Sequence, residues 1–481
     1  MAKQKQYCFF FFFLITFIFI TVKAQDKFAY KIPAGILVQQ KLKEWGDMKF
    51  GLMITWGTYS QWGVVESWSL CPEDEGWCQR TGPYKDNWYE YKKAYENLQT
   101  TFNPIKFNPQ KWAAAAKEAG MKYVLAMAKH HDGFCMFDTK TTDYKITDSK
   151  TPFSKNVRSN VTKEILNAFR NEGMMPGIYF SKPDWHAPDY WWSYFPPKDR
   201  NPTYDTKKYP EIWQRFKDFT YTQFEELMSN YGKVDLLWLD GGWVRPFRSI
   251  DSSVSWQRTI PYDQDIDMPK IAAMARNKQP GMLIVDRTVA GEYENYLTPE
   301  ALIPDETNPI PWESCMPMSS SWSYVPGAKN KSANTLIHML CNAVSKGGNF
   351  LLNVAPGPDG DWDDSSYYRL KEIGAWMKVN GEAIYGTTFI KPYKEDKMVF
   401  TKKADAVYAI YLADENEMQM PATIIINSFK KKSTTKIYLL GYDKPLALSK
   451  NDNGSINIIV PEKIRNNPPG KHAWVFKITG Q

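Results

Sequence analysis

The sequence contains little histidine, little cysteine and little net charge for its 481 residues. It has 60 basic and 53 acidic residues and no dense basic stripe, so nucleic acid is not a favoured partner. Without Cys8, which lies in an apolar leader, the six cysteines leave five, too few for a disulfide scaffold in a chain that can bury its own core. Cys71 and Cys78 share a loop-like stretch and could bridge after export, but no second pair has zinc-ligand spacing.

Long apolar runs are absent after residue 24, so no later stretch could span a membrane. Residues 1–24 differ: Lys3 and Lys5 precede an apolar run from Cys8 to Ile20, and small residues follow. This order predicts a secretory signal peptide cleaved near Ala24, and therefore a secreted or periplasmic protein with no membrane contact after cleavage. An uncleaved membrane anchor is the alternative.

The rest of the chain has the composition of a folded protein. Hydrophobic residues make up 43% and charged residues 23%, which excludes a disordered chain. Short apolar runs alternate with amphipathic stretches, and the expected strands are Met48–Ile54, Lys122–Ala128, Gly177–Ser181, Val234–Leu239 and Met282–Asp286. This alternation predicts an α/β fold with a parallel sheet, at this length a (β/α)8-like TIM barrel. An open doubly wound sheet is the alternative, which the lack of a Gly-x-Gly-x-x-Gly motif weakens.

A second pattern begins after about residue 390. Alternating or apolar runs at 398–411, 423–426, 436–440, 456–460 and 473–478 are separated by Gly, Asn and Pro turns. They predict an antiparallel β-sandwich. We therefore expect a signal peptide at 1–24, a barrel that carries the chemistry at 25–390, and a C-terminal β-sandwich at 391–481.

One carboxylate stands at the end of an apolar strand, where barrel enzymes place their chemistry. Asp240 follows Leu239 in the Trp238–Asp240 segment and is followed by two glycines, which we expect to leave room for a substrate. The pattern is typical of a nucleophile. A turn aspartate that caps the next helix is the alternative.

A second candidate carboxylate, Glu313, stands in what reads as a later aromatic loop. An apolar setting and the charge of Asp240 would raise its pKa, so that it could serve as a general acid near neutral pH. Glu66 and Glu306 are the competing acids. A loop glutamate paired with an arginine is the alternative interpretation.

Two of the five histidines, His130 and His131, are adjacent and directly follow a predicted strand. Adjacent side chains at a strand end point opposite ways and no third ligand is evident, so we assign no metal, and no organic cofactor is needed. Binding of substrate hydroxyls is favoured over a buried, satisfied pair. Aromatic residues make up 15% of the chain, and together these features indicate an enzyme or a sugar-binding protein with an aromatic and carboxylate pocket.

Six motifs resemble, in order, those of glycoside hydrolase family 29, the retaining α-L-fucosidases. They are KFGLMITWG at 49–57, AKHHDGF at 128–134, WLDGG at 238–242, WE at 312–313, SKGGNFLLNV at 345–354 and GEAIYG at 381–386. Each motif alone is weak, but the combination is specific and covers roughly residues 40–390. The resemblance implies a (β/α)8-like barrel with a C-terminal β-sandwich. It also implies an exo-acting enzyme that removes terminal α-L-fucosyl residues from glycans or glycoconjugates by double displacement.

The resemblance also implies roles for individual residues. Asp240 matches the family nucleophile, and Glu313 falls where many members keep the acid/base. The implied substrate-binding residues are Thr55, Trp56, Glu66, Trp68, His130, His131, Tyr179 (with Phe180 as a one-residue alternative), Trp238 and Arg287. No cofactor is implied.

Two departures from the family pattern affect the substrate. Thr55 replaces a sugar-binding histidine, and a Thr hydroxyl reaches less far, so a water or a shifted substrate would have to fill the gap. The family's Glu-Trp pair is interrupted by Ser67, between Glu66 and Trp68. A glycosidase for another L-galacto-configured sugar, such as an α-L-galactoside, and a non-catalytic carbohydrate-binding protein are therefore the alternatives.

Overall fold

The computed structural model describes residues 30–73, 76, 78–449 and 454–480, so the predicted signal peptide lies outside the described residues. Its helices are α1 (Ile36–Met48), α2 (Trp88–Glu96), α3 (Pro109–Glu118), α4 (Val161–Asn171), α5 (Pro210–Asn230), α6 (Met268–Lys278), α7 (Ala333–Ser345), α8 (Asp364–Asn380) and α9 (Glu462–Asn466). The first seven strands are β1 (Phe50–Ile54), β2 (Tyr123–Lys129), β3 (Met175–Ser181), β4 (Leu236–Asp240), β5 (Leu283–Asp286), β6 (Glu313–Pro317) and β7 (Asn349–Asn353). Among the described helices, none has both the length and the apolar character to cross a membrane.

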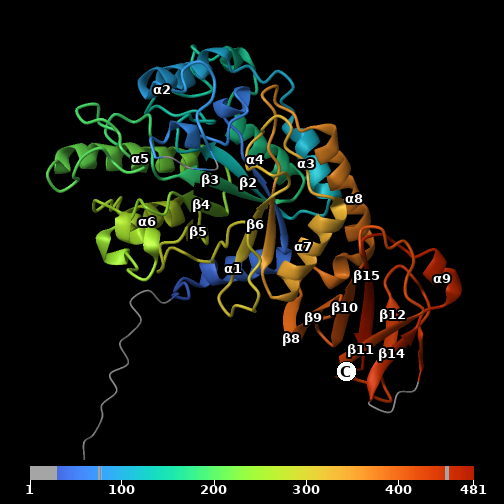
Figure 1. Ribbon diagram of the computed structural model, residues 1–481. Coiled ribbons are helices and arrows are strands. Elements are labelled where there is room, and N and C mark those ends of the chain that lie inside the picture. The colour runs from blue at the N-terminus through green and yellow to red at the C-terminus, as the bar shows by residue number, and fades with distance from the viewer. Residues whose placement is uncertain (1–29, 74–75, 77, 450–453, 481) are drawn as a thin grey trace, which may run out of the picture.

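The seven strands form one curled parallel sheet in the order β5-β4-β3-β2-β1-β7-β6, with helices on its outer side (Figure 1). This arrangement confirms the predicted (β/α)8-like TIM-barrel class. Side chains alternate between a layer under the helices and the barrel interior, as the two-residue period of a strand requires. On β1, for example, Ile54 belongs to the outer core and Met53 to the inner one.

Local sequence sets the ends of α3. The Asn108 side chain accepts a hydrogen bond from the backbone N–H of Lys111, and Pro109 takes the first helical position. Gly120, with a φ of 90°, follows the end of the helix. The start of α4 differs. Asn160 precedes the helix, but its amide donates to the Tyr231 hydroxyl at 3.1 Å and caps nothing.

The gap between β5 and β6 is closed by an irregular extended segment, residues 293–301. Its backbone runs antiparallel to β5, where Asn295 N–H donates to the Ile284 carbonyl at 3.0 Å. It then runs parallel to β6, where Glu313 N–H donates to the Leu297 carbonyl at 2.8 Å. The segment therefore rises along the barrel wall and delivers Glu300 next to Cys315.

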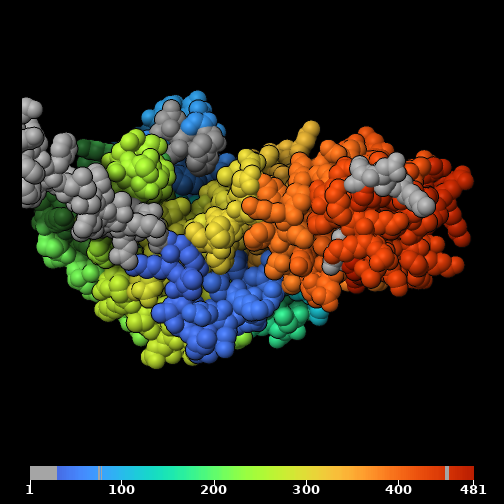
Figure 2. Space-filling view, turned by 90° about the horizontal axis from the view of Figure 1, so that it is seen from below, coloured from blue at the N-terminus to red at the C-terminus, as the bar shows by residue number. Residues whose placement is uncertain are grey.

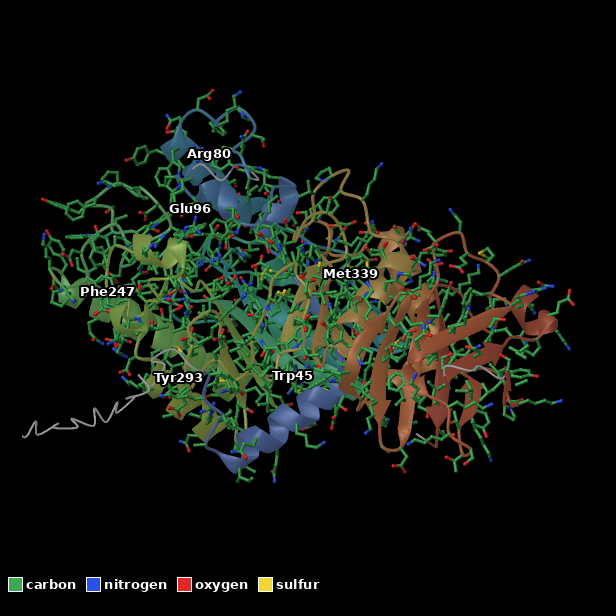
Figure 3. All side chains as sticks on the ribbon, turned by 60° about the horizontal axis from the view of Figure 1, so that its bottom comes forward. Trp45, Arg80, Glu96, Phe247, Tyr293 and Met339 are labelled. Carbon is green, nitrogen blue, oxygen red and sulfur yellow. The ribbon has the colours of Figure 1, made fainter. Side chains whose placement is uncertain are left out.

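Helix α1 closes the end of the barrel at which the strands begin, the amino-terminal end. Figure 2, seen from below, shows the blue N-terminal segment lying across this face. Trp45 of α1 points in toward the strands (Figure 3) and stacks on Tyr296 with ring centroids 3.8 Å apart. Both side chains are fully buried. The plug keeps water out of the lower half of the barrel.

Glu313 lies in this plugged lower half, and not in a loop at the mouth. It is the first residue of β6 and pairs with Asn349, the first residue of β7, so it occupies the amino-terminal edge of the sheet. Asp240 is the last residue of β4, at the opposite edge. Glu313 and Asp240 therefore lie at opposite edges of the sheet, which contradicts their predicted roles as general acid and nucleophile of one site. The motif at 345–354 contains strand β7, and the motif at 312–313 ends on the first residue of β6. The apolar-run criterion identified neither strand.

The Glu313 side chain is fully buried and accepts a hydrogen bond from the Tyr123 hydroxyl at 2.5 Å. Burial raises the pKa of Glu313 to about 8, although polar hydrogens of Tyr123, Trp238, Trp45 and Tyr296 work against the shift. The predicted rise in pKa is thus present, with burial as its cause. A protonated carboxyl at this depth acts as a hydrogen-bonding part of the core.

The C-terminal strands form two antiparallel sheets, β12-β15-β10-β9-β8 and β11-β14-β13. Their bounds are β8 (Thr388–Glu395), β9 (Met398–Lys403), β10 (Ala406–Leu412), β11 (Thr423–Lys430), β12 (Lys436–Leu439), β13 (Ala447–Ser449), β14 (Ser455–Ile459) and β15 (Ala473–Thr479). Apolar side chains of both sheets share a second core. This unit contacts the barrel helices, where Trp376 of α8 donates its indole N–H to the Ala473 carbonyl at 2.9 Å.

The position of Glu313 predicts a specific pH dependence of stability. The folded pKa is raised above the ordinary value, so between about pH 4.5 and pH 8 the folded state holds a proton that the unfolded state releases. This contribution is present at low pH and is lost as the pH rises toward 8. Glu313→Gln removes it, so the melting temperature of the variant relative to wild type should rise by about 3 °C or more from pH 5 to pH 8. Differential scanning fluorimetry at both pH values measures this, and an unchanged difference would contradict a buried protonated Glu313.

Candidate active site

A cavity of about 690 Å³ opens at the carboxyl ends of the barrel strands. The residues expected at the site that line it are Thr55, Glu66, Trp68, His130, His131, Tyr179, Trp238, Asp240 and Arg287. Two expected residues do not line it. Glu313 is buried below, and Trp56 faces outward and donates its indole N–H to the Gly357 carbonyl at 3.1 Å. The strand period explains Trp56, because Met53 and Thr55 already take the inward positions.

Asp240 is an ionised carboxylate held by donors on both oxygens. Arg287 Nη1 lies 3.1 Å from Oδ1, and the Tyr179 hydroxyl donates to Oδ2 at 2.7 Å. Burial alone would raise the pKa of Asp240, but the Arg287 charge, the nearby His131 and the Tyr179 hydroxyl outweigh it and hold that pKa below its ordinary value. Its side chain keeps 18% exposure toward the cavity. Asp240 is thus an unprotonated, oriented carboxylate with access to a ligand.

The two glycines after Asp240 make room for neighbouring chain. Gly241 has a φ of 82°, and a Cβ there would lie 2.2 Å from Cδ of Pro183. A Cβ on Gly242 would lie 2.0 Å from the Thr288 hydroxyl. The prediction that both serve substrate approach is therefore wrong for Gly241, which does not line the cavity. The glycines let β4 end tightly between two other loops.

Arg287 joins Asp240 to a second carboxylate, Glu300. While Nη1 contacts Asp240, Nη2 donates to Glu300 Oε2 in a short ion pair. Glu300 lines the cavity, and its side chain is 46% exposed at the mouth. One planar guanidinium contacts both carboxyl groups and so brings the two acids together in one cavity.

Sequence reasoning missed Glu300 and selected Glu313. The available signal was the Thr298-Pro299-Glu300 segment that follows Asp286 and Arg287, but it carries no apolar run that marks a strand. Glu306, one of the two competing acids considered, is exposed and does not line the cavity. The other, Glu66, does. The cavity lining also includes Arg200, Trp243, Trp256, Thr288, Ser320, Ser321 and Trp322, none of which the sequence singled out.

His130 and His131 both face the cavity. A register irregularity after Met127 breaks the strict alternation at the end of β2, so the two rings lie 4.2 Å apart instead of on opposite faces. Burial lowers the pKa of His131 to about 4 and that of His130 well below its ordinary value. Both rings are therefore neutral near pH 7. Ser67, the residue that interrupts the Glu-Trp pair, places its hydroxyl 2.5 Å from Nδ1 of His130.

His130, His131 and Asp240 are close enough to raise the question of a metal ion, since their donor atoms lie within 4.8 Å of one another. The donor set does not suit one. Both oxygens of Asp240 already accept from Arg287 and Tyr179, and Nδ1 of His130 is engaged by Ser67. A fixed guanidinium charge next to the carboxylate repels a cation. Neutral imidazoles beside an ionised carboxylate suit binding of hydroxyl groups.

Glu66 is a third cavity carboxyl with a different protonation state. Burial, and then the negative charges of Glu300 and Asp240, raise its pKa well above the ordinary value. The shift favours the neutral form of Glu66, which can donate an O–H. Its backbone has a φ of 41°, and its N–H donates to the Ser323 hydroxyl at 2.9 Å. A non-glycine residue held in this region of conformational space is typical of a functional site.

Two buried ion pairs fix the strand ends around the cavity. Lys129, next to His130, contacts Asp184 Oδ2 at 2.8 Å. Lys182, after β3, contacts Asp286 Oδ1 at 2.5 Å, directly before Arg287. Removing one partner from such a pair leaves an uncompensated buried charge, so these contacts hold the loops in one arrangement.

Comparison with known proteins agrees with this site. The α-L-fucosidase family matches residues 17–382, and the α-L-fucosidase C-terminal domain matches residues 392–479. Human tissue α-L-fucosidase is 29% identical over 479 residues, covering 95% of this chain and 93% of its own. The structure of α-L-fucosidase isoenzyme 1 from Paenibacillus thiaminolyticus, 27% identical, has a TM-score of 0.72 and covers 92% of this chain and 99% of its own. That of Thermotoga maritima α-fucosidase in complex with fucose is 25% identical, with a TM-score of 0.68 and coverage of 93% and 97%.

The family match extends over more than half of the chain and agrees with the motifs at positions 49–57, 128–134 and 238–242. Solved relatives in glycoside hydrolase family 29 share the barrel and the C-terminal sheets. This chain belongs to the α-L-fucosidase family, glycoside hydrolase family 29.

Proposed function

We propose that the cavity hydrolyses terminal α-L-fucosides of oligosaccharides or glycoconjugates with retention of configuration. The observation that carries the proposal is the pair of carboxylates, Asp240 and Glu300, held by the two ends of the Arg287 guanidinium in one cavity. Family membership and the fucose complex of the Thermotoga maritima relative support fucose as the sugar.

The proposed reaction has two steps. Asp240 Oδ attacks the anomeric carbon while Glu300 gives a proton to the departing glycosidic oxygen, so that a covalent glycosyl ester forms and the aglycone leaves as an alcohol. Water then attacks the same carbon, Glu300 takes its proton, and the ester bond to Asp240 breaks. Arg287 fixes both carboxylates and balances their charge through both steps.

The neutral side chains around Asp240 suit the sugar hydroxyls. His130 and His131 offer unprotonated imidazoles, and Glu66 offers a carboxylic O–H. The Arg287 guanidinium carbon lies 5.1 Å from the centroid of the Trp238 ring. Trp238 supplies an apolar wall of the kind that suits the methyl group of fucose.

We also propose that the enzyme is exported. The support is the charged start, the apolar run Cys8–Ile20 and the small residues before Gln25, which together form a secretory signal pattern.

Removal of the nucleophile gives the first test. Asp240→Gly should lower kcat/KM for aryl α-L-fucosides by about 10⁴-fold, because no group remains to form the ester. Azide, which fits the space left by the carboxylate, should restore turnover and give a fucosyl azide of inverted configuration. Product NMR identifies the anomer. Turnover near the wild-type level without azide would remove Asp240 from this role.

Removal of the general acid gives a second test, with Glu313 as the matched control. Glu300→Ala should lower kcat/KM about 10²- to 10⁴-fold for a fucosylated disaccharide, whose alcohol needs a proton to leave. Fucosyl fluoride releases a fluoride ion, which can leave without that proton, so kcat/KM for this substrate should change less than about tenfold. Glu313→Gln should show no such dependence on the leaving group. Loss of disaccharide activity with spared fluoride activity in Glu313→Gln, and not in Glu300→Ala, would assign the general-acid role to Glu313.

Thr55 bears on the choice of sugar. It lines the cavity with a shorter side chain than the histidine it replaces, so the site could accept an L-galacto sugar with a hydroxymethyl group. We expect kcat/KM for an aryl α-L-fucoside to exceed that for the matching α-L-galactoside by about tenfold or more, because the hydroxymethyl group would be desolvated against Trp238. A preference for the galactoside would make fucose the secondary substrate.

A further inference from the structure

We propose that Trp256 is an aromatic platform for the leaving-group sugar and therefore a specificity-determining residue of this site. The inference rests on the proposed function. The cavity volume is about 690 Å³, whereas one deoxyhexose fills about 200 Å³ on the scale of about 30 Å³ for a water molecule. Space therefore remains beyond the ring that Asp240 attacks.

Trp256 stands in that outer space. It lies on a short 3₁₀ turn, Ser255–Thr259, in the long loop between β4 and α6. It lines the cavity, yet 42% of its surface is exposed, unlike Trp238 at 2% and Trp243 at 7%. A large indole surface kept in contact with solvent at the rim of a binding cavity is typical of a ligand-contact surface.

Arg245 holds Trp256 in place. Its guanidinium, almost fully buried, lies over the Trp256 ring at 5.1 Å. The same group donates to the Gln257 side chain at 2.8 Å and to the Thr288 carbonyl at 2.7 Å. It also donates to the Gly242 carbonyl in a short hydrogen bond. Trp256 is therefore a preorganised surface and not a freely rotating side chain.

The same contacts place Trp256 beside the reacting groups. Gly242 is two residues after Asp240, and Thr288 directly follows Arg287. One guanidinium thus ties the platform to the segments that carry Asp240 and Arg287. The leaving oxygen departs from the anomeric carbon next to Glu300 at the mouth, so the aglycone must pass into the space that Trp256 borders.

A pyranose fits this surface better than an acyl chain or a peptide. Its ring carries C–H bonds on one face that pack on an indole, and hydroxyls at its edge that need polar partners. Ser320, which lines the cavity and is exposed, offers such a partner.

The test compares two substrates that share the fucosyl group. Trp256→Ala should lower kcat/KM for an α-L-fucosyl-galactose disaccharide about tenfold or more. It should change kcat/KM for α-L-fucosyl fluoride, whose leaving group is one atom, less than about twofold. Trp256→Phe keeps an aromatic ring and should retain most of the disaccharide activity.

Phe247→Ala is the matched control. Phe247 is an exposed aromatic of the same loop, 38% exposed, and lies at the outer edge of the molecule without lining the cavity (Figure 3). Its loss should leave both substrates unaffected. An equal fall on both substrates for Trp256→Ala, or no fall on the disaccharide, would overturn the platform. Failure of the wild-type enzyme to hydrolyse fucosyl fluoride would instead overturn the proposed function.

Discussion

The site depends on one charged contact, the guanidinium of Arg287 between Asp240 and Glu300. Burial resists the ionisation of a carboxyl group, and the Arg287 charge offsets this resistance at Asp240. The result is a different state for each acid. Asp240 is held ionised, whereas Glu66, which has no such partner and feels the charge of both neighbours, is held neutral. A nucleophile, an acid/base and a hydroxyl donor can then be built from three side chains of the same chemical type.

The barrel wall explains how these groups meet. Asp240 ends β4 and Arg287 directly follows the adjacent strand β5, so the parallel sheet brings them together directly. Glu300 arrives by another route, on the irregular segment 293–301 that fills the space between β5 and β6. That segment also carries Tyr296, which stacks on Trp45 of the plugging helix α1. The position of Glu300, the proposed acid/base, is thus supported from the closed end of the barrel, with Glu313 as a protonated member of the same buried cluster.

The sequence predicted the barrel class and nine of the residues that line the cavity, because parallel strands end in polar residues at one edge and apolar runs reveal such strands. It failed where that signal is absent. Glu313 opens strand β6, but the Trp312–Cys315 stretch resembles a loop, so a residue at the amino-terminal edge was assigned to the mouth. Glu300 was missed because a bridging segment without regular pairing has no periodicity to detect. The outward direction of Trp56 and the shared face of His130 and His131 depend on register and on an irregularity in β2, which composition does not encode.

The most direct measurement of the central claim is mass-spectrometric mapping of the covalent intermediate formed with 2-fluoro-fucosyl fluoride. The sugar should be found on the peptide that contains Asp240, and it should persist longest in Glu300→Gln, because that variant lacks the base for the second step. In Glu313→Gln the label should turn over as in the wild type. A label on another carboxylate, or persistence in Glu313→Gln and not in Glu300→Gln, would contradict an active site built on the Asp240–Arg287–Glu300 contact.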